Sequence, residues 1–215
     1  MGSEMCIRDS HKGPAALRYP RGSGLGVPLD EEMKELEIGK GEVIKDGTDI
    51  AIFAYGHTVD GAMMVSDMFE REGVSVAVIN ARFAKPVDKD LIVRYGKIAR
   101  CLVTTEEHSL KGGFGSAVLE ALQEEQACTI PVKCIGLGDM VLEHGAPGKQ
   151  RKDLKLDPEG MFETIMTFYG SVAEMASSGN GKKWLPSNGK KVAVGNGSNG
   201  NIRKSNLTVK QNLND

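Results

Sequence analysis

The chain has 215 residues, of which 40% are hydrophobic and 26% charged, so it can build one soluble domain with a buried core plus some further chain. Its formal net charge is −2, but residues 176–215 contain seven Lys or Arg and one acid (+6), which leaves −8 on residues 1–175. This acidic body argues against nucleic-acid binding, and no apolar run approaches the ~20 residues that a membrane-spanning helix needs.

The cysteines and the N-terminus indicate a reducing compartment. Cys6, Cys101, Cys128 and Cys134 form neither a CxxC pair nor a dense disulfide pattern. The first ten residues lack the apolar core of a secretory signal and carry Glu4 and Asp9, which transit peptides avoid. We predict a bacterial cytoplasmic or plastid stromal protein, not a secreted one. A plastid targeting segment would then precede the present sequence.

The first twelve residues do not fit the rest of the chain. Met5–Ser10 reads MCIRDS, which resembles the translation of a sequencing-library adaptor. The alternative is a natural, loosely ordered terminus. We therefore treat residues 1–12 as a non-native or disordered leader.

Strand and helix patterns alternate after residue 48. The run DIAIFA (Asp49–Ala54) is typical of a strand buried on both faces. Thr58 could cap a following helix from about Val59 to Glu72. The residues of this helix that we expect in the core are Val59, Met63, Met64 and Met68.

The same unit recurs along the chain, and its members share the alternation of short apolar runs with amphipathic stretches. Strands are predicted at Val74–Asn80, Cys101–Thr105 and Val132–Gly136, helices at Pro86–Ala99, Ser116–Glu125 and Pro158–Met175, and a short edge strand within Leu36–Val43. This order predicts an α/β fold: a three-layer sandwich with a mostly parallel sheet of about five strands. Residues 176–215, rich in Gly and Asn, are predicted to be a disordered tail.

Two arginines near the N-terminus could bind a phosphate. They lie in Arg18-Tyr19-Pro20-Arg21-Gly22, where Pro20 stiffens the chain between two guanidinium groups. The alternative is a solvated face or an interdomain salt bridge, which is the commoner role of exposed Arg pairs.

A second candidate is Glu106-Glu107-His108, which ends a predicted strand and precedes the glycine-rich entry Gly112–Gly115 to a helix. Ligands of open α/β sheets gather at such strand ends, helix N-termini attract anions, and two carboxylates with a His could perform acid/base chemistry. The alternative is a tight turn with a capped helix and an acidic domain contact. The glycines match no nucleotide-binding motif.

The remaining candidates are loop histidines. His144, within Glu143-His144-Gly145, and His57 follow predicted strands, and with His11 and His108 they show no metal-ligand spacing. No nucleophile elbow and no Cys–His pair close in sequence supports covalent catalysis. The residues thus predict an α/β module with anion contacts but no complete catalytic constellation.

Four segments together resemble the C-terminal portion of the 1-deoxy-D-xylulose-5-phosphate synthase family. They are GPAALRYPRG (Gly13–Gly22), LEIGKGEVIKDG (Leu36–Gly47), NARFAKPVDKDLI (Asn80–Ile92) and VTTEEHSLKGGFGSAVLEAL (Val103–Leu122). The resemblance implies that residues 13–30 end a pyrimidine-binding domain and continue as a linker. Residues 31–175 would then form a transketolase-like C-terminal domain, and residues 176–215 the tail.

The resemblance also implies the chemistry of a longer parent. Such a synthase joins pyruvate to glyceraldehyde 3-phosphate with loss of carbon dioxide, uses thiamine diphosphate and magnesium, feeds isoprenoid and thiamine synthesis, and works as a homodimer. Arg21 matches the family arginine that helps to bind the substrate phosphate. Arg18 inherits no such role. The cofactor-binding and catalytic parts of the family belong to upstream domains, so we expect the chain alone to be inactive and to bind neither cofactor. The alternatives are a noncatalytic assembly module and a part similar to the β subunit of a 2-oxo acid dehydrogenase.

Overall fold

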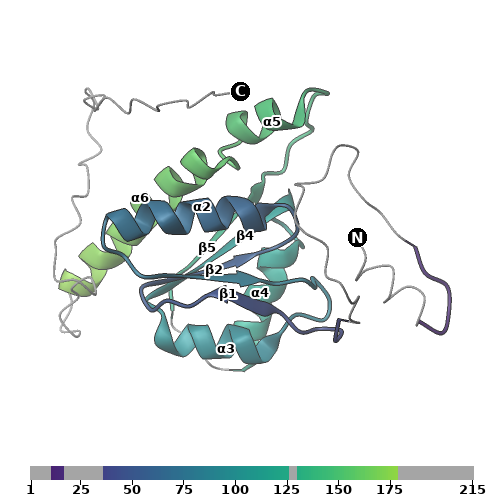
Figure 1. Cartoon of the computed structure of the whole chain (residues 1–215), viewed down its shortest axis with the longest axis horizontal. Coiled ribbons are helices and arrows are strands. Elements are labelled where there is room, and N and C mark those ends of the chain that lie inside the picture. Colours follow the sequence, from purple (N-terminus) through teal and green to yellow (C-terminus); the bar gives the residue numbers. More distant parts are fainter. Residues whose placement is uncertain (1–10, 17–35, 126–129, 179–215) are drawn as a thin grey trace, which may run out of the picture.

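A five-stranded, mostly parallel sheet is the centre of the molecule, which is seen in a computed structural model that describes residues 11–16, 36–125 and 130–178 (Figure 1). The strands lie in the order β1-β3-β2-β4-β5. Their bounds are β1 Glu42–Lys45, β2 Ile50–Ala54, β3 Val76–Asn80, β4 Cys101–Ser109 and β5 Val132–Leu137. The last four run parallel to one another, and β1 pairs antiparallel with β3 at the edge. The predicted sheet is confirmed.

Helices cover both faces of this sheet. On one face lie α2 (Thr58–Arg71) and α6 (Pro158–Ser178), and on the other lie α3 (Lys89–Ile98) and α4 (Phe114–Glu124), as Figure 1 shows. A further short helix, α5 (Pro147–Asp153), stands between β5 and α6. The three-layer sandwich is therefore confirmed.

The buried strand β2 divides the core into two halves. Ile50 and Ile52 pack with α2 and α6, whereas Ala51 and Phe53 pack with α3 and α4. Every residue of β2 is buried. This is the arrangement that a continuous apolar run predicts for a parallel strand covered on both faces.

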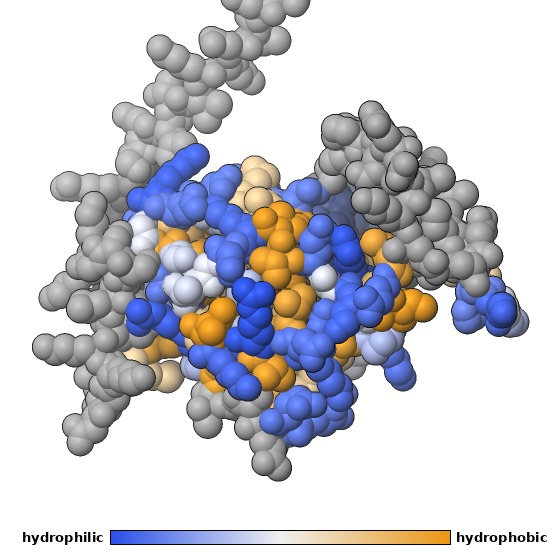
Figure 2. Space-filling model, turned by 60° about the horizontal axis from the view of Figure 1, so that its bottom comes forward, coloured by the Kyte–Doolittle hydropathy of each residue, from blue (hydrophilic) through white to orange (hydrophobic). Residues whose placement is uncertain are grey.

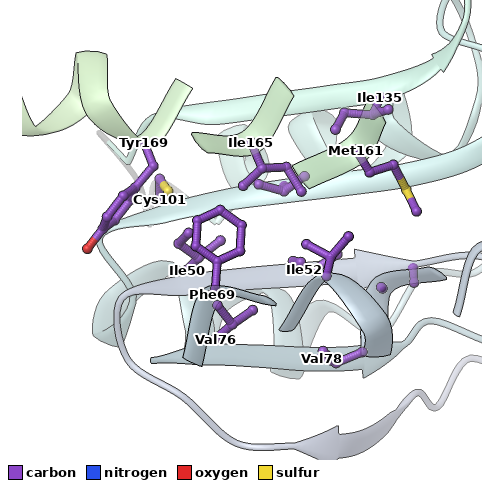
Figure 3. Packing of buried hydrophobic residues seen from close by; sticks show 14 of the residues in the cluster. Ile50, Ile52, Phe69, Val76, Val78, Cys101, Ile135, Met161, Ile165 and Tyr169 are labelled. Carbon is purple, nitrogen blue, oxygen red and sulfur yellow. The ribbon is translucent and has the colours of Figure 1, made fainter. Parts of the chain in front are cut away.

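Helix α6 runs from the end of the sheet where the parallel strands finish toward the end where they begin. Figure 3 shows Met161 near Ile135 of β5, then Ile165, then Tyr169 beside Cys101, the first residue of β4. All of these side chains belong to one buried cluster. The last turn of α6 therefore lies at the end of the domain where β2 and β4 start.

The core face of α2 differs from the one predicted. Ala62, Val65 and Phe69 form the buried row, whereas Met64 is 54% exposed, so its placement in the core was wrong. Positions 62, 65 and 69 lie on one side of a 3.6-residue helix, and position 64 points away from it. Val59 and Met63 are partly buried against the same cluster, which confirms their packing.

The start of α2 was also mispredicted. Thr58 is the first helical residue rather than the cap, and the cap residue His57 makes no side-chain capping bond. The Thr58 hydroxyl lies 3.0 Å from the Thr105 carbonyl oxygen and 2.9 Å from the Thr105 hydroxyl. The threonine thus joins the end of β4 to α2, and two buried hydroxyls satisfy each other.

Asp88 fixes the start of α3 and the approach to β1. As the N-cap of α3, its carboxylate accepts the N–H of Leu91 and, with its other oxygen, the N–H of Gly41 at 2.9 Å. Gly39 has φ +80° and lies against Pro86, where a Cβ would come within 2.9 Å of the proline ring. These contacts place Leu36–Gly41 in a turn, so β1 begins later than predicted.

The predicted domain limits remain predictions. Helix α6 continues to Ser178, three residues past the expected end at 175. The predicted linker and tail lie mostly outside the described residues.

Candidate functional site

The crevice between the ends of β2 and β4 is where a sheet of this type ordinarily holds a ligand. These two strands are neighbours, but the helices that follow them, α2 and α4, leave toward opposite faces. Such a point of divergence at the carboxyl ends of parallel strands is the usual ligand crevice. The sequence candidate Glu106-Glu107-His108 lies here, within β4, because the strand runs four residues past its predicted end to Ser109.

Glu106 occupies the anion position of this crevice. Its side chain is fully buried, and its two carboxylate oxygens accept the N–H groups of Phe114 and Gly115 at 2.7 and 2.8 Å. These are the first N–H groups of α4, where the helix dipole and the free donors favour a negative charge. The chain therefore supplies its own anion at the helix N-terminus.

Gly113 makes this arrangement sterically possible. A Cβ at position 113 would overlap the Ser109 carbonyl oxygen and lie 2.5 Å from a carboxylate oxygen of Glu106. Gly115 is similarly close to Cys134, whose sulfur would lie 2.9 Å from an added Cβ. The glycine-rich entry thus brings the helix backbone onto β4 and β5. The structure favours the capped-helix alternative over an external anion site.

The next two residues of β4 face other neighbours. Glu107 forms an ion pair with Arg151 of α5, with 2.5 Å between Oε1 and Nε. The His108 ring lies 6.0 Å from that of Tyr55, which stacks on Phe114 with centroids 5.4 Å apart. Glu106 therefore caps α4, Glu107 anchors α5 and His108 borders the surface. The three side chains do not converge on one reacting atom.

An open groove runs along the carboxyl ends of the strands, between the loop before α3 and the start of α4. We refer to it as the edge groove. Tyr55, His108 and Phe114 form its aromatic side. Its charged lining residues are Lys85, Lys89, Lys111, Glu106, Glu120 and Glu124. Lys89 pairs with Glu124 at 2.5 Å and Lys111 with Asp139 at 3.0 Å. Cations and anions alternate here, so the edge groove is not a phosphate-selective surface.

The histidines and cysteines of the described residues do not form a reactive centre. His57, His108 and His144 follow or end different strands, and in this part of the chain no three potential ligands are grouped to hold a metal. Burial raises the pKa of the Cys101 thiol to about 12, so it is protonated at neutral pH. Arg18 and Arg21 lie outside the described residues, and the substrate-binding role of Arg21 stays a prediction.

A diphosphate cofactor does not fit the crevice. The two N–H donors that could hold its phosphate already donate to Glu106, and the carboxylate would repel a second anion there. The N–H groups of Phe114 and Gly115 are therefore not free to bind a cofactor phosphate.

The family "Transketolase, C-terminal domain" matches residues 39–161 of this sequence. The chain belongs to this family. The transketolase C-terminal domain therefore includes β1 to β5, the crevice with Glu106, and the segment that contains α5. The predicted family resemblance is confirmed.

Curated relatives narrow the resemblance further. The 1-deoxy-D-xylulose-5-phosphate synthase of Thermosynechococcus vestitus is 52% identical over 159 residues, 74% of this chain and 25% of that protein. Synthase 1 of Geobacter sulfurreducens is 45% identical over the same shares of the two chains. The chain thus matches the C-terminal portion of these synthases and spans about a quarter of the length of the curated relatives.

One solved structure supports the fold at useful similarity. The split gene transketolase, described as an "inactive beta4 tetramer", is 33% identical with a TM-score of 0.57. The match covers 65% of this chain and 45% of that chain. Within the described part of this transketolase C-terminal domain protein, no helix has the length and apolar character to cross a membrane.

Proposed function

We propose that this chain is the C-terminal portion of a 1-deoxy-D-xylulose-5-phosphate synthase that condenses pyruvate with glyceraldehyde 3-phosphate and releases carbon dioxide. The supporting observation is the 52% identity to the Thermosynechococcus vestitus synthase across three-quarters of this chain. The parent would use thiamine diphosphate with magnesium, which supplies the carbanion chemistry that side chains cannot. It would act as a homodimer in isoprenoid and thiamine synthesis.

We infer that the transketolase C-terminal domain has a supporting role in this enzyme. Its crevice is filled by Glu106, its buried cysteine is protonated, and its edge groove has mixed charge. The chain alone is therefore proposed to be inactive. The cofactor and catalytic groups would come from the upstream three-quarters of the parent.

The direct test joins residues 13–215 of this chain to the region of the Thermosynechococcus vestitus synthase that precedes its match; we refer to this as the joined protein. Pyruvate- and glyceraldehyde-phosphate-dependent product formation is measured for the joined protein and for the 215-residue chain alone. We expect product only from the joined protein. A folded joined protein without activity, or an active chain alone, would contradict the proposal.

Arg21 provides a residue-level prediction. In the joined protein, Arg21→Ala should raise the KM for glyceraldehyde 3-phosphate by about tenfold or more, because a charged hydrogen bond to the phosphate is lost. The KM for pyruvate, which has no phosphate, should change little. Steady-state kinetics with each substrate varied in turn measures both constants.

Arg18→Ala is the matched control, because it removes the other arginine of the same motif. It should leave the ratio of the two KM values near that of the unmodified joined protein. Equal increases in both KM values on Arg21→Ala would refute a phosphate contact.

A separate-subunit arrangement is the second candidate. It is favoured by the similarity to the split gene transketolase, whose name says that its gene is divided. In that case this chain would be an assembly module, and activity would require mixing it with a second polypeptide, whether of the synthase or of the 2-oxo acid dehydrogenase type.

A further inference from the structure

An exposed segment follows β5, and we refer to residues 139–149 as the arm. All eleven residues of the arm are exposed. Three consecutive apolar side chains lie at its centre: Met140 is 59% exposed, Val141 97% and Leu142 38%. Contiguous apolar surface of this kind ordinarily marks an interaction site.

Polar contacts hold both ends of the arm in place. At its start, Lys111 pairs with Asp139 at 3.0 Å. Toward its end, the Gln150 side-chain amide donates to the Glu143 carbonyl at 2.6 Å. Arg151, just beyond, pairs with Glu107 of β4. The arm is therefore connected to the body of the domain at both ends, through the exposed Lys111–Asp139 pair and the partly buried Arg151–Glu107 pair.

The arm lies inside residues 39–161, the part of this chain that matches the family. Helix α5, which overlaps the end of the arm, buries none of its residues in the domain. A family segment that adds nothing to its own core is expected to contact something outside it.

The place where the chain enters the domain indicates what the arm contacts. Leu36–Gly41 lies at the carboxyl end of the sheet, where the Gly41 N–H donates to Asp88 and Glu42 pairs with Asn80, the last residue of β3. The arm leaves β5 at this same end. The upstream polypeptide is thus attached at the same end of the sheet as the arm.

The dimensions allow one upstream domain to reach both places. β1 and β5 are the outermost strands and are separated by four strand spacings, or roughly 19 Å. A domain of ordinary size has a radius of gyration of about 13–15 Å and is wider than this gap. A body tethered near β1 can therefore cover the arm beyond β5.

The other exposed large apolar side chains of the described residues are single positions on separate segments: Ile38 before β1, Ile44 on β1, Met64 on α2, Ile98 on α3, Leu119 on α4 and Met175 on α6. Ile98 and Leu119 are each 45% exposed on α3 and α4. Figure 2, which turns the bottom of Figure 1 forward, shows hydrophobic side chains in small groups with hydrophilic ones between them. Met64 is the only large apolar side chain of α2 that is exposed.

We propose that the arm is the docking contact for the upstream domain of the synthase, with Met140, Val141 and Leu142 buried against an apolar patch of that domain. This inference rests on the proposed function for the identity of the upstream domain. A second copy of this chain is the competing occupant, because the split gene transketolase neighbour is described as a tetramer.

Hydrogen–deuterium exchange followed by mass spectrometry tests this proposal. The amides of residues 139–149 are compared in the 215-residue chain and in the joined protein. We expect exchange in the arm to slow at least tenfold in the joined protein, while residues of the α2 surface around Met64 change little. Equal exchange in both proteins would overturn the proposal. So would protection in the chain alone that grows with protein concentration, because a second copy would then cover the arm.

Substitution gives an independent readout. Val141→Asp in the joined protein should return arm exchange to the rate of the chain alone, since a charge would have to be buried at the contact. Met64→Asp is the control, and it should leave the protection intact. Continued protection of the arm in Val141→Asp would count against docking through this residue. Because Val141 is 97% exposed, the variant should fold, which the thermal transition of the 215-residue variant checks.

Exchange and activity separate the two proposals. A joined protein that is inactive but protects the arm would refute the synthase assignment and retain the docking contact. An active joined protein with an unprotected arm would support the synthase assignment and refute the docking contact.

Discussion

Glu106→Ala should lower the free energy of unfolding by about 4 kcal/mol, because two buried N–H groups would lose a charged acceptor and each such bond contributes roughly 1.5–3 kcal/mol. The bonds in question run from Phe114 and Gly115 to the fully buried carboxylate. Loss of the anion also removes its favourable interaction with the N-terminus of α4. Urea denaturation of the 215-residue chain, followed by circular dichroism, measures the change.

Two further variants locate the cause of the effect. Glu106→Gln keeps the shape and one acceptor oxygen, so its loss should be roughly half as large. Glu107→Gln changes the neighbouring, partly exposed carboxylate that pairs with Arg151, and such pairs contribute about 0–1 kcal/mol. If Glu106→Ala unfolds at the same urea concentration as Glu107→Gln, the cap is not what stabilises this end of the sheet.

Phe69→Ala should also lower the free energy of unfolding by about 4 kcal/mol, the usual cost of removing a buried aromatic ring. Phe69 is fully buried on α2, with its ring centroid 4.7 Å from that of Phe162 and 6.5 Å from that of Tyr169. The ring therefore joins α2 to α6 above the sheet (Figure 3). The same urea experiment measures this loss.

Met64→Ala is the matched control on the same helix. Because Met64 is 54% exposed, its truncation should change the free energy of unfolding by about 0.5 kcal/mol or less. A loss from Met64→Ala as large as that from Phe69→Ala would mean that α2 is rotated relative to the sheet. Unchanged dependence of the free energy on urea in both variants would show that the comparison concerns the folded state.

Local chemistry explains which parts of the fold were predictable. β2 is an uninterrupted apolar run, and Asp88 is a capping residue directly before α3. Both elements can therefore be predicted from residues that are neighbours in the sequence. Met64 was misplaced because methionine fits the core and the surface alike, and the side that is buried depends on how α2 lies on the sheet. α5 was missed because it buries no residue and so has no apolar periodicity to recognise.

The candidate site was predictable in place but not in role. The order of Glu106 and the glycines put a carboxylate and a helix start at the same end of the sheet. Whether the N–H groups of α4 face a bound anion or the protein's own carboxylate depends on how β4 continues through Ser109 and turns back. The Glu107–Arg151 pair joins residues 44 positions apart, and no local sequence pattern predicts it.

The course of α6 gives the molecule two ends with different uses in the laboratory. Its last turn, ending at Ser178, lies where β2 and β4 begin, whereas the arm and the entry at Leu36–Gly41 lie where the parallel strands finish (Figure 1). A dye, a biotin or a sensor surface attached after Ser178 would therefore stand at the pole opposite the docking contact. Immobilisation through that pole should leave the arm facing solution, so binding partners can be screened on this chain without masking the surface under study.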